Sequence, residues 1–183
     1  MMSRITMVLM ISCWAVSCGP DTTEFERRGT ALTDLTQQKL QGELQAAMKA
    51  GGPANAVAFC ASRAQVLMDS LSRASGTQIR RATMRPRNTV DRATALEELA
   101  LEFYTQRQLA SDSLRPTVDV DNGVVHYYRP IILSRPCLAC HGTLGEHIAP
   151  ETAEVITAAY PDDRATGYAE GDLRGVWHVT FTP

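Results

Sequence analysis

The chain has 183 residues, of which 18 are Lys or Arg and 20 are Asp or Glu, giving a formal net charge of −2. This balance argues against nucleic acid as a partner, because there is no basic surplus to displace counterions from phosphates. The length suits one compact domain with a sizeable core better than two.

The first residues have the pattern of an export signal. Arg4 precedes a short apolar run, Ile5 to Trp14, and small residues follow it before Cys18. The run is too short for a membrane-spanning helix. We therefore predict a signal peptide over residues 1–17 and a single domain over residues 18–183, which works outside the cytoplasm.

The signal's last residues leave two modes of export open. Ala15-Val16-Ser17-Cys18 resembles the lipobox of bacterial lipoproteins, in which the cysteine is acylated and holds the protein on a membrane surface. Ordinary signal peptidase accepts the same small-x-small triplet. The expected location is periplasmic or extracytoplasmic, as a membrane-anchored lipoprotein through Cys18 or as a secreted protein.

Two helices are predicted next. Leucines spaced three to five residues apart indicate a long helix from Thr22 to about Ala50, and Gly51-Gly52-Pro53 should stop it. A second helix is expected from Ala54 to about Ala74, with Cys60 on its core side.

A strand and a third helix follow. Thr77 to Met84 is expected to be a strand, which the proline-containing segment 85–88 interrupts. The third helix should begin at an Asp91 cap. Its apolar stripe is the clearest amphipathic pattern in the chain and consists of Leu96, Leu99, Ala100, Phe103 and Tyr104.

The C-terminal half favours strands. Asp121-Asn122-Gly123 predicts a tight hairpin between Thr117–Val120 and Val124–Leu133. A short helix over 150–159, a loop over 160–172 and a last strand over 175–182 complete the pattern. Helices followed by antiparallel strands with helices interleaved indicate an α+β domain.

The motif Cys137-Leu138-Ala139-Cys140-His141 is the most specific feature of the sequence. Two cysteines two residues apart can add their thiols to the two vinyl groups of one haem, and the histidine that follows becomes the proximal iron ligand. Its second ring nitrogen is expected to donate to a backbone carbonyl. A redox-active Cys-x-x-Cys pair, half a zinc site and coincidence are the alternatives. Export favours a single covalent haem c, because c-type haem is joined outside the cytoplasm.

The ligand on the other side of the iron is less evident. The candidates, which sequence alone leaves open, are Cys60, Met68, Met84, His126, His147 and His178. Cys60 stands out because the other four cysteines have separate fates in the signal peptide, the lipobox and the haem motif. A thiolate is a strong iron ligand, but a lone cysteine is also often a small buried hydrophobe.

Several segments together resemble a family of small exported domains of PAS-like fold that bind a single c-type haem. They are Ala56–Cys60, Ile79–Thr83 followed by Arg87-Asn88, Tyr128–Ile131, the haem motif with Gly142, Tyr160–Asp163 and Gly171–Gly175. The resemblance implies an antiparallel sheet of four to five strands with helices packed on it, preceded by a long N-terminal helix. It also implies that Cys60 and His141 lie on opposite sides of the iron.

Arginines are candidate partners for the haem propionates, since a guanidinium can hold a carboxylate through two hydrogen bonds. We consider Arg80, Arg87 and Arg129, together with Arg81, which must face away from Arg80 on a strand. A solvated strand face is the alternative for each of them.

Three functions remain open on this basis. A redox or small-ligand sensor would act when Cys60 is displaced, and an electron-transfer cytochrome would need only the haem and a partner protein. An enzyme such as a peroxidase would need an open iron position with a distal acid-base group. The expected partner is a redox or signalling protein that the sequence does not identify.

Overall fold

The computed structural model describes residues 21–182, so the predicted signal peptide and Cys18 lie outside the described residues. The helices are α1 (Thr22–Phe59), α2 (Gln65–Ser75), α3 (Ala95–Leu109), α4 (Leu138–His141) and α5 (Pro150–Ala159). The strands are β1 (Gln78–Ala82), β2 (Thr117–Asp121), β3 (Val124–Ile132) and β4 (Leu173–Phe181). Within these residues, no helix is both long enough and apolar enough to cross a bilayer.

The four strands form one antiparallel sheet in the order β1-β4-β3-β2. The predicted hairpin between β2 and β3 is confirmed, and its turn places Asn122 at φ 49° and Gly123 at φ 81°. Both values lie in the left-handed region that Asn and Gly tolerate, which explains why this pair closes the hairpin. The predicted α+β fold with an antiparallel sheet of four to five strands is therefore confirmed, and the sheet has four.

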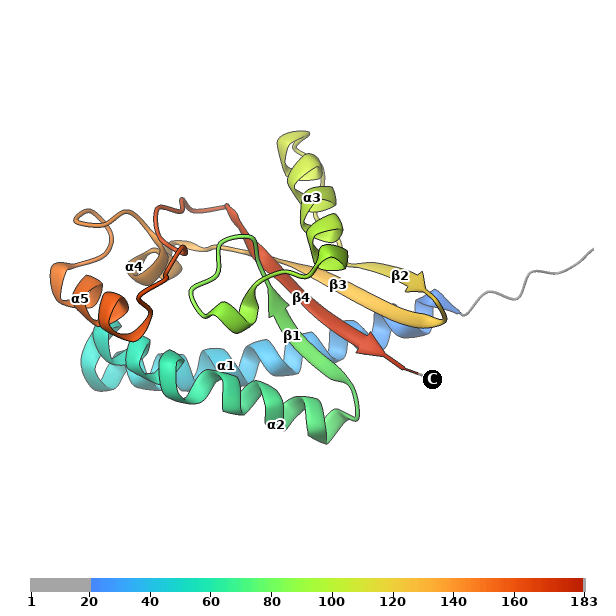
Figure 1. Cartoon of the computed structure of the whole chain (residues 1–183), viewed down its shortest axis with the longest axis horizontal. Coiled ribbons are helices and arrows are strands. Elements are labelled where there is room, and N and C mark those ends of the chain that lie inside the picture. The colour runs from blue at the N-terminus through green and yellow to red at the C-terminus, as the bar shows by residue number, and fades with distance from the viewer. Residues whose placement is uncertain (1–20, 183) are drawn as a thin grey trace, which may run out of the picture.

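One face of the sheet packs against α1 and α2, which run alongside each other below it (Figure 1). Tyr127, Trp177 and Phe181 are among the buried residues of this core. Gly29 lets α1 approach closely, because a Cβ atom at that position would lie 2.2 Å from Cγ of Tyr127. The Tyr127 hydroxyl also forms a 3.0 Å hydrogen bond with Thr30. Tyr127 is thus one of the side chains that hold the long N-terminal helix to the sheet.

The predicted helix break is present, and a second irregularity follows it. Gly51 and Gly52 leave helical geometry, with φ 68° at Gly52, so that the chain kinks before Pro53. Further on, Cys60–Ala64 forms a π-helical turn, which joins α1 to α2. The periodicity of the sequence did not predict this turn.

The third helix differs from the prediction in its start and in its buried face. Its cap is Thr94, whose hydroxyl accepts from the Glu97 amide while the Glu97 carboxylate accepts from the Thr94 amide. Asp91 instead belongs to a short 3-10 turn and pairs with Arg81. A reciprocal capping box satisfies two backbone donors, so it defines the helix start better than a lone aspartate.

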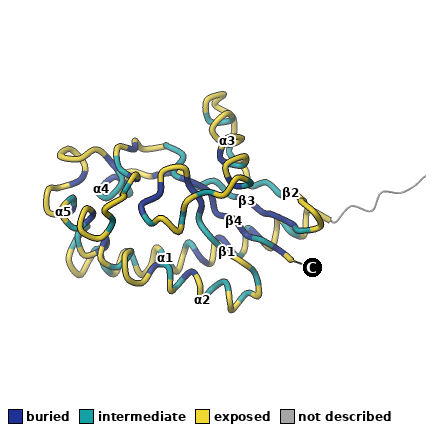
Figure 2. The backbone as a smooth tube through the Cα atoms, viewed as in Figure 1, coloured by how far each residue is buried: buried dark blue, intermediate teal, exposed yellow. Residues whose placement is uncertain are grey.

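The face of α3 that meets the sheet consists of Glu97, Leu101 and Tyr104. The Tyr104 hydroxyl donates to the backbone of Tyr128, while Leu99 and Phe103 of the predicted stripe are 70% and 43% exposed. Of the predicted stripe, therefore, only Tyr104 is buried. The helix stands above the sheet, and its outer side is largely exposed (Figures 1 and 2).

Strand β4 is buried on both faces, because α1 covers one face and α3 the other. His178 on β4 and its neighbour His126 on β3 are 7% and 8% exposed. Their rings join through a 2.9 Å contact between Nδ1 of His126 and Nε2 of His178. Nδ1 of His178 lies 2.7 Å from the Glu97 carboxylate. These three side chains form a buried polar network between α3 and the sheet, where an exposed position had been considered for each histidine.

Candidate functional site

The cysteine motif lies just beyond the end of β3, in a 3-10 turn over Arg135–Cys137 that continues into α4. Cys137 and Cys140 are free thiols three residues apart, so they project from one side of this single turn. The sheet that precedes them is antiparallel, unlike the parallel strand that leads into a thioredoxin-type motif. Among residues 21–182, no three His, Cys, Asp or Glu side chains are grouped to hold a metal ion. The zinc alternative therefore lacks its remaining ligands in this part of the chain.

His141 is held in one orientation by the backbone. Its Nδ1 lies 2.8 Å from the carbonyl oxygen of Ala165, as expected from the sequence. Because a carbonyl can only accept, Nδ1 carries the hydrogen and Nε2 keeps its lone pair. Burial, helped by the positive charges of Arg87 and Arg174, lowers the pKa of His141 to about 3. The imidazole is therefore neutral at physiological pH, as a metal ligand must be.

The loop after α5 is fastened to this turn. The amide of Tyr168 donates to the carbonyl of His141, and the amide of Gly167 donates to that of Gly142. The ring of Tyr168 stands edge-on to that of His141, with centroids 6.4 Å apart. Gly142 has no room for a side chain, because a Cβ there would lie 2.8 Å from the Leu138 carbonyl oxygen. The motif and the distant loop thus form one rigid unit.

Arg87 completes this unit. Its guanidinium donates twice to the Asp163 carboxylate and once, at 2.7 Å, to the carbonyl of Cys140. Arg87 and Asp163 are each only 9% exposed. Arg87 therefore ties the motif to the loop, and its contact with a haem propionate stays a prediction.

Cys60 lies near the motif, on the first residue of the π-helical turn. Val57, one turn earlier on α1, belongs to the apolar cluster against which Cys140 packs. Burial raises the pKa of the Cys60 thiol, while Arg81 and Arg87 act in the opposite direction. Cys60 also contributes to the raised pKa of Cys140, whose main cause is burial. The two cysteines therefore lie close enough for the charge of one to affect the pKa of the other.

The other candidate ligands lie elsewhere. Met68 is 2% exposed within the core beneath the sheet, and Met84 is 55% exposed. His147 lies in the loop after the motif, where its Nδ1 accepts from the Thr143 amide. Nδ1 of His126 contacts Nε2 of His178, and Nδ1 of His178 contacts the Glu97 carboxylate. These three ring nitrogens are therefore engaged within the buried network.

The arginines on β1 face opposite ways, as their alternation requires. Arg80 lies on the α3 side, 3.3 Å from the Glu97 carboxylate. Arg81 lies on the side of Cys60 and His141, and its charge affects the pKa of both. Arg129 already pairs with Asp34 on α1. The structure therefore places Arg81 at the site, and each of the three arginines has a carboxylate partner, which for Arg81 is Asp91.

Arg174, which the sequence analysis did not single out, also lies at the site. Its charge lowers the pKa of His141, and burial lowers its own pKa. Its guanidinium donates to the Thr83 hydroxyl, and no carboxylate among residues 21–182 pairs with it. Its place in the loop-to-strand segment 171–175 was visible in sequence, but the direction of its side chain was not.

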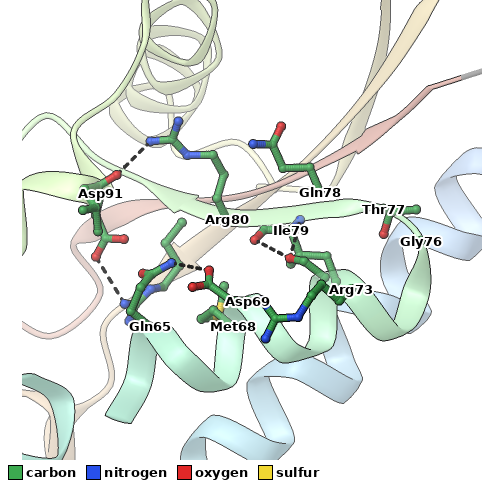
Figure 3. A pocket seen from close by; sticks show the side chains of 13 residues that line it. Gln65, Met68, Asp69, Arg73, Gly76, Thr77, Gln78, Ile79, Arg80 and Asp91 are labelled. Carbon is green, nitrogen blue, oxygen red and sulfur yellow. Dashed lines mark hydrogen bonds and ion pairs between the residues drawn. The ribbon is translucent and has the colours of Figure 1, made fainter. Parts of the chain in front are cut away.

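A groove of about 650 Å³ runs between α2 and β1 (Figure 3). Ser72 of α2 covers the free edge of β1 there, because its hydroxyl accepts from the Ile79 amide and donates to the Ile79 carbonyl. The groove borders the site only through Arg81 and Asp91, and none of the cysteines lines it.

Fold and site together define an α+β domain of PAS-like architecture that carries one Cys-x-x-Cys-His turn at the end of its sheet. The chain belongs to the Tll0287-like family, whose model matches residues 22–182. A crystal structure of the cyanobacterial heme-protein Tll0287 is similar, with 27% identity over 90% of this chain and 96% of that chain and a TM-score of 0.66. No curated protein matched the chain. The family resemblance expected from the sequence is thereby confirmed.

Proposed function

We propose that this chain binds one haem covalently through Cys137 and Cys140, with His141 as an iron ligand. The observation that carries the proposal is the hydrogen bond from Nδ1 of His141 to Ala165, which leaves a neutral Nε2 free beside the two thiols. The similar heme-protein Tll0287 supports the choice of cofactor. When bound, the haem supplies one-electron redox chemistry.

The charges around the site suit the acidic groups of a haem. Nε of Arg81 is buried and has no hydrogen-bond partner among the described residues. A terminal nitrogen of Arg81 pairs with Asp91, whereas Arg174 has no carboxylate partner among the described residues. Buried charges normally have partners, so an anionic group is expected beside them. We infer that these two arginines hold the propionates, in place of the residues proposed from sequence alone.

Cys60 is the second iron ligand in this proposal. Burial raises the pKa of its thiol, and the charges of Arg81 and Arg87 offset part of that rise. Two protein ligands leave no vacant position for a substrate, so the arrangement suits electron transfer better than catalysis. One observation favours a sensor as the second candidate, because π-helical turns frequently occur at functional sites and Cys60 begins one.

The first experiment tests covalent attachment. Protein matured with a cytochrome c assembly system should retain its haem stain on a denaturing gel, and the Cys137→Ser/Cys140→Ser double variant should lose it. Cys60→Ala serves as a matched control, because it removes one thiol and should keep the stained band. A wild-type band without haem stain would refute the proposal.

Spectra then separate the two roles. Oxidised wild-type protein should show a low-spin spectrum with thiolate character that Cys60→Ala abolishes. If the reduced protein does not bind carbon monoxide, electron transfer is supported, whereas rapid binding would support the sensor. An unchanged spectrum in Cys60→Ala would exclude Cys60 as a ligand.

The location is proposed from the sequence alone. We propose that the protein acts outside the cytoplasm and is held on a membrane surface through a lipid on Cys18. Mass spectrometry of the mature N-terminus tests this, since an acylated cysteine and an unmodified one differ by the mass of the lipid. Cys18→Ser should release the protein from the membrane fraction, and persistence there would contradict the lipid anchor.

A further inference from the structure

The outer face of α3 is an apolar surface that no described element covers. Leu99 is 70% exposed and Phe103 43% exposed, and Leu96 is partly buried beside them. These three side chains follow one another at steps of three and four residues, so they form one stripe along the helix. The buried face of α3, with Glu97, Leu101 and Tyr104, lies on its opposite side.

This helix is placed where a partner can reach it. It rises from the sheet and stands clear of α1, α2 and α5 (Figure 1), and its tube is mainly exposed or half-buried (Figure 2). Leu99 and Phe103 are neighbours on this projecting helix and, with Leu96, form one apolar patch rather than scattered single side chains. The surface therefore fits a second helix packed along it.

The stripe has the spacing of a short coiled coil. If Leu96 and Phe103 take the first core position of each heptad, Leu99 and Gln106 take the other core position. Glu102 and Arg107 then fall on the two flanks, at the positions that form ion pairs between helices. Glu102 is exposed and Arg107 is partly exposed, and both charges are present on the same 15-residue helix.

The charges favour a second copy of this chain in parallel orientation. In a parallel pair, Glu102 of one copy meets Arg107 of the other, and symmetry forms the same ion pair twice. An antiparallel pair would bring like charges together. In the single chain Arg107 contacts Asp112 at 3.6 Å, but both side chains are about half exposed, and such pairs contribute little and exchange readily.

We propose that this protein forms a symmetric dimer through the Leu96-Leu99-Phe103 face of two parallel α3 helices. The partner lies on the side of α3 away from the sheet, so the haem site stays open in each copy. The proposal does not depend on haem binding. A helix of this length presents only two heptads, and we therefore expect a dimer that dissociates on dilution.

Sedimentation equilibrium of the haem-loaded mature protein at several concentrations tests the proposal. Wild-type protein should approach twice the monomer mass at high concentration. Leu99→Glu should weaken association at least tenfold, whereas Leu35→Glu, which changes a 45% exposed leucine on α1, should leave it unchanged. Circular dichroism confirms that each variant is folded.

Charge reversal tests the orientation. Glu102→Arg and Arg107→Glu should each weaken association, and the double variant should restore it. A monomer at every concentration would overturn the proposal, as would a dimer that Leu99→Glu does not affect. A monomer that binds lipid vesicles through the same leucine would overturn it in favour of a membrane surface.

Discussion

Glu97 offers the sharpest test of how α3 is held to the sheet. Its carboxylate is fully buried and accepts from the Thr94 amide and hydroxyl, while it also contacts His178 and Arg80. Replacement by alanine removes all of these contacts at once. The capping interaction is worth about 1 kcal/mol, and each buried polar group left without a partner costs about 1–3 kcal/mol.

We therefore expect Glu97→Ala to lose about 3 kcal/mol of unfolding free energy, and urea denaturation followed by circular dichroism measures it. In a chain of this size that loss corresponds to a Tm decrease of about 6–12 °C. Thr94→Ala should lose only the capping part, about 1 kcal/mol. Glu98→Ala, on the exposed side of the same turn, should change stability by less than about 0.5 kcal/mol. If Glu97→Ala costs no more than Thr94→Ala, the buried network contributes nothing and the reasoning is wrong.

Burial and His178 lower the pKa of His126 from its ordinary 6.5, so the folded state binds fewer protons than the unfolded state and stability should fall as the pH drops below about 6.5. The urea midpoint should thus decrease between pH 7.5 and 5.5, and an equal slope in His126→Gln would contradict this assignment. Gly29→Ala should destabilise the protein by at least about 2 kcal/mol, because its Cβ would overlap Tyr127. Gly42→Ala should stabilise it by about 0.5–1 kcal/mol, because a Cβ there meets nothing within 4 Å. Thermal melts of the two variants test both expectations. Gly142→Ala should lower the yield of haem-stained protein, because its Cβ would overlap the His147 side chain and the Leu138 carbonyl of the motif, and a wild-type yield would refute this.

Local chemistry made much of the fold predictable. The turn at Asn122-Gly123 and the break at Gly51-Gly52 depend on backbone angles that few other residues adopt, so residue identity alone indicated them. The face of α3 could not be predicted in the same way. Glu97 is buried because His178, 81 residues away, meets it across the sheet, and apolar periodicity carries no sign of such a pair.

The candidate site could likewise be predicted only where its residues are close in sequence. The cysteines and His141 are contiguous, so their spacing alone indicated their chemistry. Alternation on β1 indicated that Arg80 and Arg81 face opposite ways, but which one faces Cys60 depends on where β1 lies in the sheet. The pairing of Arg87 with Asp163 joins residues 76 positions apart, so its tie between the motif and the loop was visible only in the fold.

The π-helical turn at Cys60–Ala64 has a consequence for how this domain can change through mutation. Such a turn holds one residue more than an α-helical turn, so deletion of a single residue there would rotate everything before it by about 100° relative to α2. Because α1 and α2 both pack on the sheet, the chain would then lose the fit of one of these helices or turn Cys60 away from its present direction. Deletion of one residue in this turn would therefore change which side chain lies beside the cysteine motif, without any substitution in the core.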